Sequence, residues 1–198
     1  MYRNGIKRLL AVILSLGGMI CLSPLLLVLC IAIKLDSPGP VFFKQKRVGI
    51  HKQHFNILKF RTMRIDTPHD MPTHLLHDPD QYITRVGRFL RKTSLDELPQ
   101  LWNILKGDMS FVGPRPLISS EMRAHRLRLE YGVYRFRPGL TGWAQINGRD
   151  SISLLRKMKL DKEYCDNWSL KLDLIILLRS VGAVVKQEGF HEGTYHRR

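Results

Sequence analysis

The sequence predicts an α+β fold that is mainly helical and has a membrane element at its N-terminus. An uncharged stretch covers residues 9–33, two short aromatic and β-branched runs at 41–43 and 55–60 flank a turn, and helical patterns follow. We therefore expect a re-entrant membrane helix over residues 1–35. A cytosol-facing domain over residues 36–198 is expected to contain a small β-hairpin and amphipathic helices at the membrane interface.

The uncharged stretch is long enough to cross a bilayer, since about 20 residues suffice. Pro24 removes a helical hydrogen bond near its middle, and Ser23 can donate to a carbonyl that the proline frees. Basic residues stand at both ends: Arg3, Lys7 and Arg8 before it, and Lys34, Lys44, Lys46 and Arg47 after it. The positive-inside rule places both ends on the cytosolic face, so we predict a helix–break–helix that returns to that face. A straight transmembrane anchor, a signal peptide and a buried helix are the alternatives.

Composition limits the class of partner. The chain has 198 residues, with 32 Lys and Arg against 17 Asp and Glu, giving a formal net charge of +15. This charge indicates a polyanionic partner, whether nucleic acid, acidic lipid or phosphate groups. Cys21, Cys30 and Cys165 form neither a disulfide framework nor a CxxC metal motif, which fits a reducing compartment.

Residues 93–116 carry the most informative pattern in the chain. Two adjacent acids, Asp96 and Glu97, stand where a short helix is predicted to begin, and Gly107 ends that helix. Its apolar stripe consists of Leu98, Leu101, Trp102 and Leu105. The pattern therefore places two carboxylates where a helix begins.

A structural role for the two acids is the alternative. Ser94 and Glu97 have the spacing of a capping box, although Pro99 would then be the fifth helical residue, where its ring clashes. A helix that begins at Asp96 places Pro99 in the first turn, where proline is tolerated. In both registers we expect backbone N–H groups and the helix dipole to keep Asp96 ionised, which suits a cap and an attacking carboxylate equally.

Basic residues on both sides of this pattern are candidates for phosphate binding. Seven Lys or Arg and no acid lie between residues 44 and 64, which is typical of a lipid-headgroup patch; we assign Lys59 and Arg61 to the substrate side. Arg85, Arg88 and Arg91 recur every three residues, so a helix would align them either toward Asp96 or toward solvent and lipid. Arg115 lies between two prolines and has little conformational freedom to lose on binding phosphate.

The remaining segments carry weaker signals. Residues 135–149 combine Arg137, Gln145 and Arg149 with three glycines, which let backbone N–H groups approach an anion, although no Walker pattern is present. The loop at 66–80 is rich in His and Asp but lacks metal-ligand spacing, and we assign it no role. Helical patterns are predicted over 118–131, 152–167 and 170–185; the last carries too many charges to span a membrane and is predicted to be core or interfacial.

Three runs resemble a known family: SLDELPQLWNILKGDMSFVGPRP, FRPGLTGWAQINGR and KFRTM. In order and spacing they are similar to the bacterial sugar transferase family of small monotopic phosphoglycosyl transferases, through nearly the whole chain. The Ser23-Pro24 pair resembles the break in that family's re-entrant membrane helix. The short N-terminus MYRNGIKRLL and the short tail resemble, within the family, the members that transfer N,N'-diacetylbacillosamine 1-phosphate.

This resemblance implies a function. The family transfers a sugar 1-phosphate from a UDP-sugar to undecaprenyl phosphate with Mg²⁺ and releases UMP, at the cytosolic face of the bacterial inner membrane, as the first membrane step of glycoconjugate assembly. The domain at residues 36–198 is then catalytic. From the resemblance we expect no nucleic-acid partner.

The resemblance also implies roles for individual residues. Asp96 matches the nucleophile that attacks the β-phosphate and forms a phosphosugar–enzyme, and Glu97 matches the acid that holds the metal. Arg91, Arg115 and Arg137 match family arginines, which implies that they bind phosphates, and we expect Lys59 to bind phosphate with them. Gln145 and Arg149 lie in the second signature, the run FRPGLTGWAQINGR, without a defined role. Two other functions remain as alternatives: a membrane-anchored basic adaptor for anionic lipid or nucleic acid, and a UDP-sugar hydrolase that uses the same aspartate.

Overall fold

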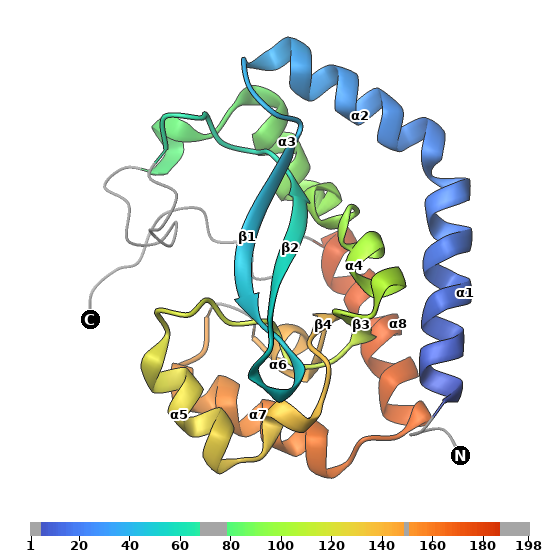
Figure 1. Cartoon of the computed structure of the whole chain (residues 1–198), viewed down its shortest axis with the longest axis vertical. Helices are drawn as coiled ribbons and strands as arrows, with labels where there is room; N and C mark the ends of the chain where they lie inside the picture. Colours follow the sequence, from blue (N-terminus) through green and yellow to red (C-terminus); the bar gives the residue numbers. More distant parts are fainter. Residues whose placement is uncertain (1–4, 68–78, 149–150, 187–198) are drawn as a thin grey trace.

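The computed structural model describes residues 5–67, 79–148 and 151–186 (Figure 1). Its elements, with η marking 3₁₀ helices, are α1 (Ile6–Cys21), α2 (Ser23–Asp36), β1 (Phe42–Val48), η2 (Ile50–Lys52), β2 (His54–Phe60), η4 (Pro79–Tyr82), α3 (Arg85–Thr93), η5 (Leu95–Glu97), α4 (Gln100–Lys106), β3 (Ser110–Val112), α5 (Met122–Glu130), η6 (Val133–Arg135), β4 (Gly139–Thr141), α6 (Trp143–Ile146), α7 (Leu154–Asp166) and α8 (Leu170–Lys186). The predicted mainly helical α+β fold is confirmed. Most of the loop predicted at 66–80 lies outside the described residues.

The helices α1 and α2 form the predicted bent N-terminal pair. Their axes differ by 62° at the break, and Ser23 Oγ donates to Ile20 O at 2.8 Å. That carbonyl lies four residues before Pro24, which has no N–H to offer it. Within the described ranges, no single helix has the length and apolar character to cross a membrane, whereas the bent pair taken together does.

The N-terminal pair packs along one side of the molecule (Figure 1). α1 lies on α4, where Ala11 joins a core cluster with Leu101 and Ile104, and α2 lies on α3. Leu29 and Ile33 on α2 are buried in a second cluster. The bent N-terminal helix pair therefore packs directly against α3 and α4, the two helices on either side of the acidic pair.

Two small sheets complete the frame. β1 and β2 form the predicted antiparallel hairpin, in which Phe43 lies opposite Lys59 and Arg47 opposite Phe55. β3 pairs with β4 in parallel, with Ser110 opposite Gly139. The predicted C-terminal helices are confirmed as α5, α7 and α8.

Lys7 ties α1 to the C-terminal helices. Its Nζ lies 2.8 Å from Asp173 Oδ2 on α8 and donates to Tyr164 OH on α7 at 2.8 Å and to Val112 O on β3 at 2.9 Å. The Tyr164 hydroxyl in turn donates to Asp173 Oδ1 at 2.7 Å. One ammonium group thus satisfies acceptors from three elements.

Replacing Lys7 is expected to destabilise the fold. Lys7→Ala leaves the buried Asp173 without its cation, and we expect a loss of about 1.5–3 kcal/mol in the free energy of unfolding. Denaturant unfolding in a fixed detergent measures this loss. Lys171→Ala, which removes an exposed cation of α8, is the matched control; equal losses in the two variants would contradict the role given to Lys7.

Candidate active site

The acidic pair lies in a 3₁₀ turn between two α-helices. α3 ends at Thr93, Ser94 takes a left-handed conformation with φ 58°, and η5 contains Asp96 and Glu97. α4 begins only at Gln100, so the prediction that its helix starts at Asp96 is corrected: Pro99 stands at the N-cap instead. Ser94 makes no side-chain cap hydrogen bond, so the capping-box alternative is not realised.

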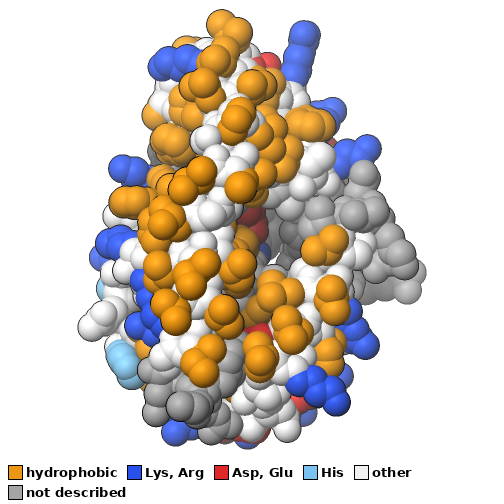
Figure 2. Space-filling model, turned by 90° about the vertical axis from the view of Figure 1, so that its right-hand side faces the viewer, with side chains coloured by type: hydrophobic (Ala, Val, Ile, Leu, Met, Phe, Trp, Pro, Cys, Tyr) orange, Lys and Arg blue, Asp and Glu red, His pale blue; other side chains and the backbone are white. Residues whose placement is uncertain are grey.

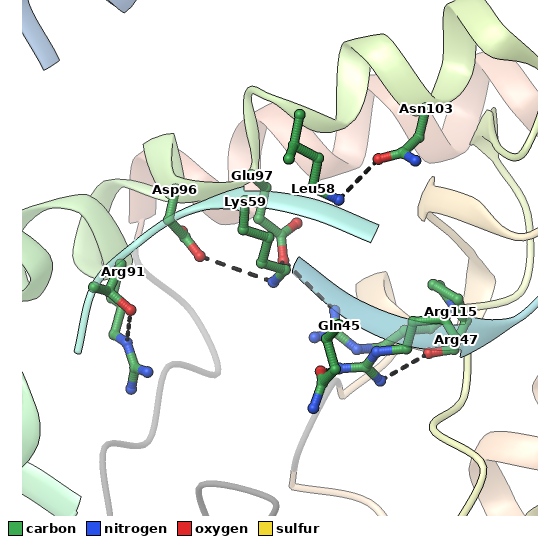
Figure 3. A network of polar contacts seen from close by, with 11 residues as sticks. Gln45, Arg47, Leu58, Lys59, Arg91, Asp96, Glu97, Asn103 and Arg115 are labelled. Carbon is green, nitrogen blue, oxygen red and sulfur yellow. Dashed lines mark hydrogen bonds and ion pairs between the residues drawn. The ribbon is translucent and has the colours of Figure 1, made fainter. Parts of the chain in front are cut away.

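Basic side chains from two other elements reach the acidic pair (Figure 3). Lys59 of β2 donates from Nζ to Glu97 Oε1 at 2.6 Å and lies 3.8 Å from Asp96 Oδ2. Arg115, which follows β3, places Nη1 3.9 Å from the same Glu97 oxygen. The side chains of Asp96 and Glu97 are only 14% and 18% exposed, so little solvent screens these charges.

Burial raises the pKa of Asp96 above its usual range. The charge of Lys59 is the largest influence that opposes this shift; Glu97 raises the pKa further, while Arg91 and Arg115 lower it. The influences on this pKa are burial and neighbouring side-chain charges, so the helix end expected to favour the ionised form is not among them. The ionised form depends on neighbouring cations and gains further support from any bound cation.

Arg91 reaches the pair from the last turn of α3. Its Nε donates to Thr62 Oγ1 at 2.9 Å, and its charge acts on Asp96. The helix predicted from the spacing of Arg85, Arg88 and Arg91 is confirmed as α3, and the other two arginines are exposed. Figure 3 shows the cluster of charged side chains around the acidic pair. Arg91 and Asp96 lie at one end of this cluster, and Lys59 and Glu97 lie in its middle.

Arg61 lies elsewhere. Its side chain is buried, and its guanidinium donates to the Pro38 carbonyl, to Ser37 O at 2.7 Å and to Ile33 O at 3.4 Å, all at the carboxyl end of α2. Both Nη atoms of this guanidinium donate to these carbonyls, which holds the carboxyl end of α2 to the hairpin. This placement corrects the prediction that Arg61 faces a substrate.

Arg61→Gln is accordingly expected to lower stability. It leaves carbonyls at the end of α2 without donors, and we expect a cost of about 1.5–3 kcal/mol. Arg64→Gln, at an exposed residue paired with Asp66, is the control. Unfolding midpoints of the two variants in one detergent measure the difference, and similar midpoints would contradict the capping role.

The second signature forms a different part of the molecule. Arg137 donates from Nε to Gly107 O at 2.9 Å, which places its guanidinium at the carboxyl end of α4. Gln145 lies on α6, and both polar atoms of its amide are buried without a hydrogen-bond partner in the described part of the chain. Arg149 lies outside the described residues.

Close backbone packing accounts for the glycines of this signature. A Cβ atom at Gly139 would lie 2.1 Å from Gly113 N, and one at Gly142 would lie 2.1 Å from Gly113 O. These glycines therefore let two backbone segments cross. The prediction that they admit an anion is corrected for these two positions.

Sequence reasoning missed two residues of the site. An open hollow, which we call the hairpin hollow, is lined by Arg47, Ile57, Lys59, Glu97, Gln100, Arg115, Pro116, Gly139 and Leu140. The sequence pattern places Arg47 only in the basic flank of the N-terminal helix pair, and it assigns no role to Gln100. Alternation along the hairpin was the available signal, because Arg47 lies on the same face of the sheet as Lys59.

A large apolar surface lies on the side of α1 and α8 (Figure 2). Its exposed residues include Leu9, Ile13, Leu16 and Ile20 on α1, Leu27, Val28 and Ile31 on α2, and Leu174, Leu178 and Val181 on α8. Exposed apolar area of this extent marks a protein or membrane interface. The run at 170–185 is predicted to be core or interfacial, and α8 has both kinds of side chain: Ile176 is buried in the core, whereas Leu174 and Leu178 are exposed.

The comparison with known families shows to which protein family the chain belongs. The model of the bacterial sugar transferase family matches residues 2–187. The chain belongs to the bacterial sugar transferase family. The predicted family, and with it a transferase enzyme, is confirmed.

Curated members of this sugar transferase family are similar along most of the chain. An uncharacterized sugar transferase of Bacillus subtilis, EpsL, is 43% identical over 187 residues, which cover 94% of this chain and 91% of the relative. The UDP-glucose:undecaprenyl-phosphate glucose-1-phosphate transferase of Caulobacter vibrioides is 44% identical over 188 residues (90% and 69%). The undecaprenyl-phosphate galactose phosphotransferase of Salmonella typhimurium is 37% identical over 198 residues (93% and 41%).

Several of these relatives are much longer than this chain. The match covers 38% of a Xanthomonas campestris glucose-1-phosphate transferase and 41% of the Salmonella protein. Their names refer to glucose and galactose, so the narrower resemblance to members that transfer N,N'-diacetylbacillosamine 1-phosphate stays a prediction.

Proposed function

We propose that this chain transfers a sugar 1-phosphate from a UDP-sugar to undecaprenyl phosphate and releases UMP, through a phosphosugar bound covalently to Asp96. The observation that carries the proposal is one largely buried carboxylate beside a second acid, with three basic side chains acting on it. The names of the Caulobacter and Salmonella relatives support the two substrates. Because burial raises the energy of an ionised carboxylate, Asp96 is suited to attack rather than to rest as a solvated surface acid.

The reaction would proceed in two displacements. An Asp96 carboxylate oxygen forms a bond to the β-phosphorus, the bond from phosphorus to the bridging oxygen breaks, and UMP leaves with that electron pair. An oxygen of the lipid phosphate then attacks the same phosphorus and releases the Asp96 carboxylate. Lys59, Arg91 and Arg115 would stabilise the negative charge that develops in both steps.

We propose that Glu97 holds Mg²⁺ together with the phosphates of the substrate. Carboxylate oxygens suit this ion, which commonly binds one or two carboxylates plus substrate phosphates. When bound, the ion neutralises phosphate charge. In the described residues no group of three or more metal-binding side chains occurs, so a site here would need substrate oxygens to complete it.

We propose that α1 and α2 dip into the cytosolic leaflet of the bacterial inner membrane while α8 lies at its surface. The 62° bend, the exposed apolar side chains and the basic residues at both ends of the pair support this arrangement. Tags at the two chain ends, tested for protease protection in sealed vesicles, are expected on the same side. Tags on opposite sides would contradict the dip.

UMP release tests the proposed function. Purified protein in nanodiscs receives Mg²⁺, undecaprenyl phosphate and one of a panel of UDP-sugars that includes the glucose, galactose and N,N'-diacetylbacillosamine donors. We expect steady UMP release with a preferred donor, and only when the lipid phosphate is present. Release of free sugar phosphate without lipid would favour the hydrolase, and no release with any donor would favour the basic adaptor.

The pH dependence of UMP release tests the environment of Asp96. The attacking form is the carboxylate, so the rate should fall as pH drops through the raised pKa of Asp96. Lys59→Gln removes the cation that most lowers this pKa, and we expect the acidic limb of the profile to move to higher pH. Lys52→Gln, at an exposed position of the hairpin turn, should leave the limb in place; an unmoved limb in Lys59→Gln would contradict the assignment.

A further inference from the structure

The hairpin hollow contains hydrogen-bond donors that the fold leaves unused. Arg47 Nε and Gln100 Nε2 are buried and have no hydrogen-bond partner among the described residues. Gln100 is 2% exposed, and both residues line the hollow. Buried donors without acceptors are costly, so a hollow lined by two of them favours a ligand rich in acceptor oxygens.

The charges around the hollow point to an anion. Arg47, Lys59 and Arg115 line it, and Glu97 is the one acid among its lining residues. Burial and the nearby charge of Arg115 lower the pKa of Arg47 to about 10, against the opposing charges of Glu121 and Glu97, so Arg47 stays charged at neutral pH. Two neighbouring guanidinium groups repel each other until an anion lies between them.

Arg47 is also held in place. Its Nη1 donates to Pro116 O at 3.1 Å and its Nη2 donates to Gln45 Oε1 at 2.5 Å. These bonds fix the guanidinium of β1 against the loop that carries Arg115. Nε, which has no hydrogen-bond partner among the described residues, and the second N–H of each Nη remain as donors for a ligand.

The hollow is offset from the nucleophile. Asp96 and Arg91 are not among its lining residues, and Figure 3 shows Arg47 and Arg115 at the end of the cluster opposite to Arg91. In phosphoryl transfer the attacking and leaving oxygens lie roughly in line through the phosphorus. The in-line requirement is met if a group in the hairpin hollow lies across the reacting phosphorus from Asp96.

We propose that Arg47, Gln100 and Arg115 form one phosphate-monoester subsite that serves both displacements. The inference rests on the proposed two-step function. In the first step the subsite holds the phosphate that departs with the nucleotide; in the second it holds the lipid phosphate, which must approach from the side that the nucleotide phosphate has left. The phosphorus that Asp96 attacks lies outside this subsite, nearer Lys59 and Arg91.

Binding measurements on the full chain in nanodiscs test this subsite. Equilibrium dialysis gives the affinity for UMP, and a water-soluble short-chain polyprenyl phosphate is tested as its competitor. Arg47→Gln and Gln100→Leu are expected to weaken both ligands about tenfold or more, because each loses a hydrogen bond to a charged phosphate. Arg47→Lys keeps the charge and should lose less than Arg47→Gln.

The control is Lys46→Gln, which removes a neighbouring exposed cation of the same strand. It should bind both ligands as the wild-type chain does, and its thermal midpoint shows whether the Arg47 and Gln100 variants are folded. Three results would each overturn the proposal. They are unchanged UMP affinity in folded Arg47→Gln and Gln100→Leu, no UMP binding by the wild-type chain, and variants that lose UMP binding but keep normal lipid-phosphate binding. Failure of the subsite would leave lipid-dependent UMP release intact, whereas failure of the proposed function would abolish that release in the wild-type chain.

Discussion

Asp96→Asn is expected to abolish UMP release, with a loss of at least about 10⁴-fold in turnover. The asparagine side chain has nearly the same shape but is neutral, so it cannot form the bond to phosphorus. Burial of Asp96 and the cations around it make this carboxylate the reacting group in the proposed mechanism. The measurement is UMP release at saturating donor and lipid phosphate.

Asp108→Asn provides the matched control. Asp108 lies just beyond α4, where it pairs with Lys106 at 3.3 Å and accepts from Asn103 at 3.1 Å, outside the acidic pair. We expect its variant to keep most of its turnover. Full turnover in Asp96→Asn would contradict both the transferase and the hydrolase and would leave the basic adaptor as the better account.

Arg128→Leu is expected to produce the largest loss of stability, about 3–5 kcal/mol. Arg128 Nη2 of α5 donates to Asp161 Oδ2 of α7 at 2.6 Å, and each side chain is only 3% exposed. Removing the guanidinium leaves a buried carboxylate without its cation. Denaturant unfolding in one detergent measures the loss.

The pH dependence of this variant should have a definite sign. Burial already raises the pKa of Asp161, which Arg128 opposes, so the variant raises it further. Between the unfolded and folded pKa values the folded state binds more protons, so the stability of the variant falls as pH rises through that window. The double variant Arg128→Met with Asp161→Leu should recover much of the loss; failure of both effects would contradict the buried pair.

The sequence predicted the parts of the fold that depend on local rules. The Ser23-Pro24 break follows from a missing N–H, and the structure shows Ser23 on the freed carbonyl of Ile20. The hairpin follows from two β-branched and aromatic runs around a turn, and α3 follows from the spacing of its arginines. These features need no knowledge of distant contacts.

Features that depend on packing could not be predicted in this way. Arg61 and Lys59 stand two positions apart in one basic run, but only the packing of α2 shows that carbonyls take up one guanidinium while Lys59 meets the acids. Likewise, the pKa of Asp96 depends on burial by distant segments rather than on its own helix end. The two acids could be predicted because they lie in a recognisable motif. That Arg47 and Gln100 line one hollow could not be predicted, because it depends on the packing of the hairpin against α4.

The most direct test of the central claim is the intact mass of the protein after incubation with its preferred UDP-sugar and Mg²⁺ in the absence of lipid phosphate. The proposed mechanism predicts an added mass equal to one sugar phosphate, located on Asp96 by peptide mapping, absent from Asp96→Asn and removed when undecaprenyl phosphate is added. An unmodified wild-type chain under conditions that support lipid-dependent UMP release would contradict the covalent intermediate.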